Sequence, residues 1–167
     1  MLDSDNNLAD VLGTLSKFWL SQSIVPSALD LQYVRAISQA NGVKLPPDFE
    51  QFYCLLNGMP DVFPHDMDSE GYAFWQIERL SAVQKEWVII TQETATIESV
   101  AATVFADYLI SCWEFGFIAD SIGDGYRIGI MAFGNEFKVI STSLAGFLKL
   151  YMKDADVLYD WKNPFRS

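Results

Sequence analysis

The residues with the clearest spacing for chemistry are acidic and lie near the middle of the chain. One short run, with acids at alternate positions and then a glycine, resembles positions one, three, five and six of a calcium-binding loop: Asp66, Asp68, Glu70 and Gly71. Position twelve of such a loop holds a glutamate that binds through both oxygens, whereas this chain has Ile77 there. The helix pattern that normally precedes the loop is also missing. We therefore favour an acidic, solvated loop and predict no bound metal and no other cofactor.

Other patterns for catalysis or metal binding are incomplete. The chain has one histidine, His65, and two cysteines that are far apart in sequence, so a zinc site lacks ligands. Cys54 and His65 could act as a nucleophile and base, but the sequence offers no third group that would orient the base. Two carboxylates could meet in space as in glycoside hydrolases, yet with 22 acidic residues some pair will be close by chance. The sequence therefore presents no catalytic motif.

The cysteines indicate the redox environment that we expect. Cys54 lies in an apolar helical pattern and Cys112 in an aromatic strand pattern. Such thiols are usually small buried hydrophobic side chains rather than a disulfide or a reactive pair. We expect both to be buried, which fits a reducing cytoplasm.

Negative charge is concentrated in one part of the chain. The 167 residues include 11 basic and 22 acidic side chains, which gives a net charge of −11. Between Leu45 and Gly125 there are 14 acids and two bases, Arg79 and Lys85, so this segment alone carries −12. Such a surface repels nucleic acids and anionic membranes and attracts basic proteins. A merely solvated, soluble surface explains the charge equally well.

Length and composition predict a single soluble domain. Half of the residues are hydrophobic and 20% are charged, which is typical of a globular protein. The longest uncharged stretch, residues 18–29, is too short for a membrane helix, which needs about 20 residues. The first residues are acidic where a signal or transit peptide would be basic. We predict a cytoplasmic location.

The order of the expected elements predicts an α+β fold. Helical spacing and capping residues favour helices over residues 6–21, 28–41 and 45–57, a short helix over 81–90, and a helix that begins at Ser143. Alternating or aromatic runs favour strands near 72–77, 102–107, 112–119, 126–133 and 137–141. We expect an antiparallel or mixed meander with helices packed against it.

Two blocks of sequence carry a resemblance to a known family. The first runs from Leu45-Pro46 through Phe49 and Phe52 to Asn57-Gly58, and the second covers residues 104–115. Both blocks resemble the SUKH superfamily, which includes the yeast regulator of cell-wall glucan synthesis. The last helix, with Phe147, also resembles that of the family. The likeness spans roughly residues 29–153. We accordingly divide the chain into a helical extension over 1–26, a core over 27–153 and a tail over 154–167.

The resemblance implies a non-enzymatic protein-binding domain. Many bacterial members are taken to be immunity proteins that neutralise a toxin from a competing bacterium, often a nuclease. A nuclease must be basic to hold its substrate, so an acidic inhibitor suits it. We predict contacts through exposed acids on loops and strand edges: Asp61, Asp66, Asp68, Glu70, Asp107, Glu114, Asp120 and Asp124.

A second hypothesis is a regulatory or scaffold module that binds an endogenous protein. It rests on the N-terminal helix with Phe18 and Trp19, for which the resemblance offers no role. An amphipathic stripe of this kind usually faces a core, and we favour packing over partner binding.

Overall fold

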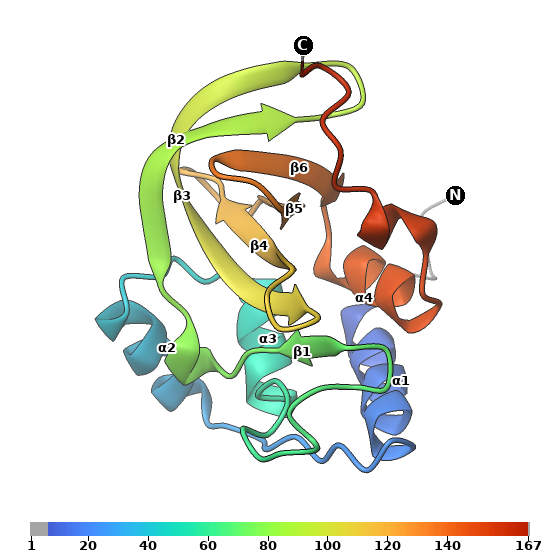
Figure 1. Cartoon of the computed structure of the whole chain (residues 1–167). Coiled ribbons are helices and arrows are strands. Elements are labelled where there is room, and N and C mark those ends of the chain that lie inside the picture. Colours follow the sequence, from blue (N-terminus) through green and yellow to red (C-terminus); the bar gives the residue numbers. More distant parts are fainter. Residues whose placement is uncertain (1–6, 167) are drawn as a thin grey trace.

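The structure, a computed structural model, describes residues 7–166 and is an α+β fold. The α-helices α1, α2 and α3 come first in the described chain, followed by a curved sheet and then by α4 (Figure 1). The helices are α1 (Leu8–Leu20), α2 (Leu31–Ala40), α3 (Pro47–Leu55) and α4 (Leu144–Met152), with short 3-10 turns η2 (Ile77–Arg79) and η3 (Asp156–Tyr159). The strands are β1 (Tyr72–Phe74), β2 (Ala82–Ile90), β3 (Ala95–Tyr108), β4 (Trp113–Ala119), β5 (Tyr126–Met131) and β6 (Glu136–Ser141). The predicted fold class is confirmed.

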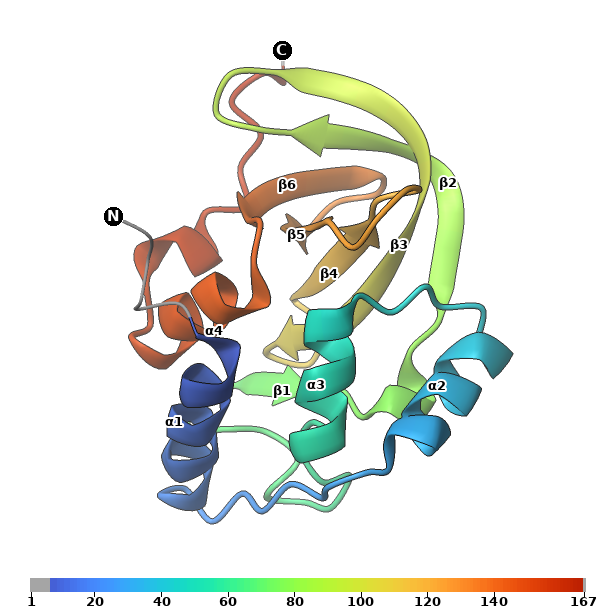
Figure 2. The same ribbon diagram turned by 180° about the vertical axis from the view of Figure 1, so that it is seen from behind.

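The sheet is mixed and closes on itself. Its strand order is β1-β3-β2-β6-β5-β4, and β3 also pairs with β4. The long strand β3 makes this closure possible, because residues 95–103 pair with β2 while residues 103–108 pair with β4. All pairings are antiparallel except that of β2 with β6. The two-strand hairpin of β2 and β3 extends beyond the rest of the sheet toward the C-terminus (Figures 1 and 2).

Aromatic side chains fill the main core between the helices and the sheet. Figure 2 shows α3 lying across the sheet, with α1 and α4 beside it. Phe49 of α3 packs against Phe105 and Phe117, with ring centroids 5.1 Å and 4.3 Å away. A second, smaller core of Trp87, Ile89, Ala102, Ile118 and Phe137 is contributed by the strands alone. Both cores follow from the curl of the sheet, which gives it two apolar surfaces.

The N-terminal helix α1 belongs to the main core. Asn7 caps it by accepting a hydrogen bond from the backbone N–H of Ala9. Leu15 and Trp19 are fully buried, and the indole N–H of Trp19 donates to the hydroxyl of Tyr151 on α4 at 3.0 Å. The expectation that the stripe packs on the core is confirmed.

One predicted element is wrong. Residues 81–90 are expected to be a short helix but form strand β2, and β3 begins at Ala95, ahead of the strand expected near 102–107. Ser81 and Gln84 imitate a helix cap, but Trp87-Val88-Ile89-Ile90 is rich in residues that favour strands. Nine residue pairs join β2 to β3 in this hairpin, so pairing with the next strand overrides the local signal for a helix.

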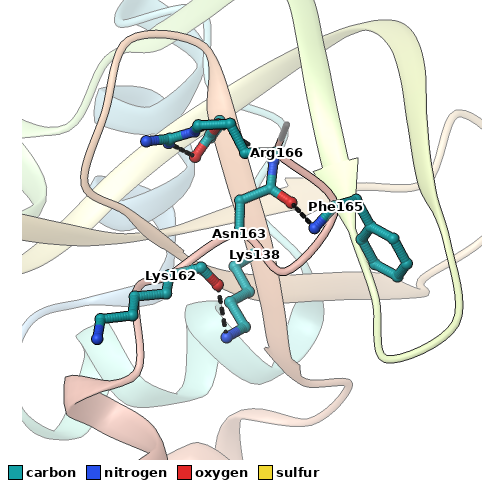
Figure 3. A network of polar contacts seen from close by, with 6 residues as sticks. Lys138, Lys162, Asn163, Phe165 and Arg166 are labelled. Atoms are coloured by element: carbon teal, nitrogen blue, oxygen red, sulfur yellow. Dashed lines mark hydrogen bonds and ion pairs between the residues drawn. The ribbon is translucent and has the colours of Figure 1, made fainter.

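The end of the chain is held against β6 by a network of polar contacts (Figure 3). Arg166 forms an ion pair with Glu136 at 2.6 Å, and Asn163 donates to the same carboxylate at 3.2 Å. Burial acts to raise the pKa of Glu136, but these two donors outweigh it and lower the pKa below its ordinary value. Lys138 donates to the carbonyl of Lys162 at 2.9 Å.

In the part of the chain that the structure describes, no helix is long and apolar enough to cross a membrane.

Candidate functional site

A cleft of about 590 Å³ lies beside the short edge strand β1. Its walls come from the loop before β1, from the segment around η2 and from the turn between β3 and β4. Four acidic residues line it, namely Asp61, Asp66, Glu78 and Asp107. Arg79 is the one cation among the described residues that line it. We call this hollow the acidic cleft.

Asn57 and Gly58 shape the wall beside β1. Asn57 is buried, and its side-chain oxygen accepts a hydrogen bond from the backbone N–H of Ile77 at 2.9 Å. Gly58 has a φ of +66°, and a Cβ atom there would lie 2.6 Å from the carbonyl oxygen of Trp75. Only glycine fits this close approach. The pair Asn57-Gly58 therefore follows the end of α3, as predicted. It also brings the loop between α3 and β1 against Trp75.

Asp107 is buried at the base of the cleft, so its prediction as an exposed contact is wrong. Only 4% of it is exposed, and both of its carboxylate oxygens accept hydrogen bonds. One oxygen accepts from the indole of Trp75 at 2.7 Å, and the other from the backbone N–H of Ser111 at 3.1 Å. Asp107 thus joins the edge of the sheet to the turn between β3 and β4.

Glu114 lies directly opposite Asp107 on the paired strand β4. Burial raises the pKa of Glu114, and the negative charge of Asp107 raises it further. A hydrogen bond with Ser111 and the positive charge of Arg79 act in the opposite direction without cancelling the rise. The guanidinium of Arg79 lies over the ring of Trp75, 3.6 Å from its centroid. The cleft thus combines acids, one cation and an aromatic surface.

Asp68 is the second predicted contact that proves to be buried. It is 6% exposed, and one oxygen accepts from the backbone N–H groups of Glu70 and Tyr72, each at 2.9 Å. The other oxygen accepts from the hydroxyl of Tyr151 at 2.5 Å. Burial, together with the charge of Asp68, raises the pKa of Tyr151. Asp68 therefore ties the loop to α4, and its prediction as an exposed acid is wrong.

The likeness to a calcium loop does not extend to the structure. Both oxygens of Asp68 bind protein groups. Within residues 7–166, no three side chains of His, Cys, Asp or Glu are arranged to hold a metal ion.

The remaining predicted acids fall into separate places. Asp61 is exposed, while Asp66 is partly buried and has one oxygen with no hydrogen-bond partner in the described part of the chain. Glu70 lines a small cavity of about 260 Å³ near Asp68. Asp120 and Asp124 are exposed in the turn between β4 and β5, at the far end of β4. A strand of this length spans roughly 20 Å, so these two acids do not belong to the acidic cleft.

Asp120 borders a second cleft of about 520 Å³, where β3 diverges from β4. Lys44 covers this turn by donating to the backbone carbonyls of Asp120 and Gly123, at 2.5 Å and 3.3 Å. Arg127 and Glu98 form an ion pair of 2.8 Å beside it. The negative charge of the acids is therefore balanced by cations in this second cleft, whereas acids outnumber cations in the acidic cleft.

Sequence reasoning missed several residues of the acidic cleft. Glu78, Trp75 and Arg79 line it without any sequence pattern that marks them as contacts, and so does Ile110, a residue that is 82% exposed. The available signal was an apolar pair, Leu109-Ile110, between two strands where a turn residue was expected. Cys112 was expected to be buried and is exposed instead, because it ends this turn.

The comparisons with known proteins give no family. No protein-family model, no curated protein and no solved structure matches the chain. The likeness to the SUKH superfamily therefore stays a prediction from two blocks of sequence.

Proposed function

We propose that the chain is a non-enzymatic binding domain that neutralises a basic bacterial toxin domain, as an immunity protein. The observation that carries this proposal is the acidic cleft, which is lined by four acids, one of them the buried Asp107, and by one cation. A basic protein with a protruding Lys or Arg would find complementary charge there. A nucleic acid would be repelled by the same charge.

Electrostatic steering gives the cleft a role in the rate of association. Exposed acids at the rim, such as Asp61, attract a basic partner over about one Debye length, roughly 8 Å at physiological salt. Fast capture suits an inhibitor that must act before a toxin reaches its substrate. The support for a toxin as the partner is the resemblance of residues 45–58 and 104–115 to the SUKH superfamily.

The test begins with the chain as bait in lysate from its own organism, at low and at high salt. We expect one basic toxin domain to be retained at low salt and weakened at high salt. The purified toxin should then lose its activity when an equal amount of the chain is added. Recovery of endogenous housekeeping proteins, or of nothing at any salt, would refute the proposal and favour the regulatory or scaffold hypothesis.

Charge reversal locates the contact once a toxin has been recovered. The variant D61K/D66K changes two acids of the cleft. A matched control, E93K/D124K, makes the same change of charge at two exposed turns elsewhere. Asp68 is left unchanged in this experiment, because it is buried and accepts a hydrogen bond from Tyr151, so its reversal would disturb folding.

A further inference from the structure

The turn between β3 and β4 has a backbone conformation that its residues disfavour. Leu109, Ile110 and Ser111 have φ values of +48°, +54° and +61°, and none of them is glycine. A left-handed conformation costs an L-residue free energy because its Cβ approaches the following carbonyl oxygen. A β-branched residue such as isoleucine is an outlier there. Three successive residues of this kind make the turn strained.

Specific hydrogen bonds hold the turn in place. The backbone N–H of Leu109 donates to the carbonyl of Gly71 at 2.9 Å, which attaches the turn to the start of β1. The N–H of Cys112 donates to the carbonyl of Tyr108 at 2.9 Å. Asp107 accepts from Ser111, while Trp75 fixes its other oxygen. The surrounding structure thus imposes the conformation, as is typical of functional sites.

The result is an isoleucine displayed to solvent at the rim of the acidic cleft. Ile110 is 82% exposed and lines the cleft. The loop that contributes Asp61 and Asp66 to the cleft also exposes Val62 and Phe63 to solvent. The strain lowers the stability of the fold, and the exposed side chain of Ile110 gains no burial that would offset it. Exposed apolar groups framed by polar ones mark interaction surfaces.

The charge of the cleft determines the chemistry of the partner. Asp61, Asp66 and Glu78 line the same cleft as Ile110 and give it negative charge. A complementary surface is therefore a basic protein with an apolar pocket ringed by Lys or Arg. An anionic membrane would be repelled by the same acids.

We infer that Ile110 is an apolar anchor by which this chain docks into such a pocket of a basic protein, with Asp107 as its positioning residue. This inference rests on the proposed function and names the feature of the partner that the cleft recognises. Anchors of this kind contribute most of the affinity when the acids around them exclude water from the contact and fix the position of the partner.

Two peptides of equal charge test the anchor without the natural partner. The probes are acetyl-Arg-Arg-Leu-Leu-Arg-Arg-amide and the same peptide with both leucines replaced by serine. Their affinities are measured by NMR on protein labelled at isoleucine methyl groups. We expect the leucine peptide to bind about fivefold to tenfold more tightly, because leucine buries apolar area against the turn. Its binding should shift the methyl signals of Ile110.

A matched variant separates the anchor from exposed isoleucines in general. Ile122 is 89% exposed between Asp120 and Asp124, at the other end of β4. We expect Ile110→Ser to abolish the preference for the leucine peptide, Ile110→Leu to preserve it, and Ile122→Ser to leave it unchanged. All three changes are at exposed positions, so each variant should fold, which circular dichroism checks.

Equal affinity of the two peptides, no binding by either, or loss of the preference in Ile122→Ser would overturn the anchor. Its failure is distinguishable from failure of the proposed function. If a basic toxin is captured and neutralised but the peptides bind equally, only the anchor falls. If the chain binds the leucine peptide more tightly than the serine peptide but no toxin is recovered, the anchor is supported and the toxin hypothesis is refuted.

Discussion

The two turns at the ends of β4 share a composition but are built differently. The turn before β4 displays Ile110 between Asp107 and Glu114, and the turn after it displays Ile122 between Asp120 and Asp124. In the second turn the residue with positive φ is Gly123, at +81°. In the first, three residues with side chains take that conformation.

The difference separates a turn that only reverses the chain from one that presents a side chain. Gly123 adopts its conformation without steric cost, and no atom lies within 4 Å of where its Cβ would be. Around the first turn, a buried carboxylate and an indole maintain a conformation that the local sequence does not favour. Exposure of an isoleucine or nearness of acids does not distinguish the two turns. The first is held by a buried carboxylate, whereas the second is held at the surface by Lys44.

The largest expected effect is on the support itself. Asp107→Ala removes the acceptor for both Trp75 and Ser111, leaving two buried or partly buried donors without a partner. We expect a loss of about 3 kcal/mol in the free energy of unfolding. Asp124→Ala, at an exposed position of the other turn, should change it by less than about 0.5 kcal/mol. Urea denaturation of both variants measures the difference, and equal losses would remove the contrast between the turns.

A smaller effect on the free energy of unfolding should appear when glycine is introduced into the first turn or removed from the second. The two changes should have opposite signs. Ile110→Gly relieves the left-handed strain at an exposed site and should stabilise the fold by about 1 kcal/mol. Gly123→Ala introduces that strain with no packing change and should destabilise by about 1 kcal/mol. Thermal unfolding measures both. If Ile110→Gly is destabilising, the turn is not strained and the comparison fails.

The smallest effect concerns the carboxyl pair across β3 and β4. Burial, followed by the charge of Asp107, raises the pKa of Glu114, so the folded state holds this proton more tightly than the unfolded chain does. Stability from this group is present at low pH and is lost as pH rises through the raised pKa. Glu114→Gln should therefore stabilise the fold at neutral pH, by less than about 1 kcal/mol because solvent screens the charge.

Denaturation of Glu114→Gln and the parent protein at pH 4 and pH 7 tests this sign. The gain should shrink toward pH 4, where the carboxyl of the parent protein is increasingly protonated. Asp124→Asn serves as the control for removing one negative charge at the exposed turn. A gain for Glu114→Gln that grows at acidic pH would contradict the assignment.

Local signals allowed much of the helical part of the fold to be predicted from sequence. The Asn57-Gly58 stop of α3 and the cap of α4 at Ser143 depend on residues next to each helix end. The apolar stripe of α1 likewise packs as its spacing predicts. The strand β2 was missed because its partner, β3, lies in a segment rich in Thr and Glu that resembles a link.

The site was harder to predict because burial of an acid is a property of the tertiary structure. Asp68 is buried through Tyr151, which is 83 residues away, and Asp107 through Trp75, which is 32 residues away. Short-range sequence patterns do not predict hydrogen-bond partners that are so far away in the chain. The convergence of Asp61 and Asp66 with Ile110 likewise depends on the pairing of β1 with β3.

The most direct test of the account is the association rate of the chain with its captured basic partner, measured by stopped flow for D61K/D66K and for E93K/D124K across a range of salt. We predict that the cleft variant associates at least about tenfold more slowly at low salt and loses most of its salt dependence, while the control stays close to the parent protein. Equal slowing of the two variants would show that overall charge, rather than the acidic cleft, attracts the partner, and would contradict the account.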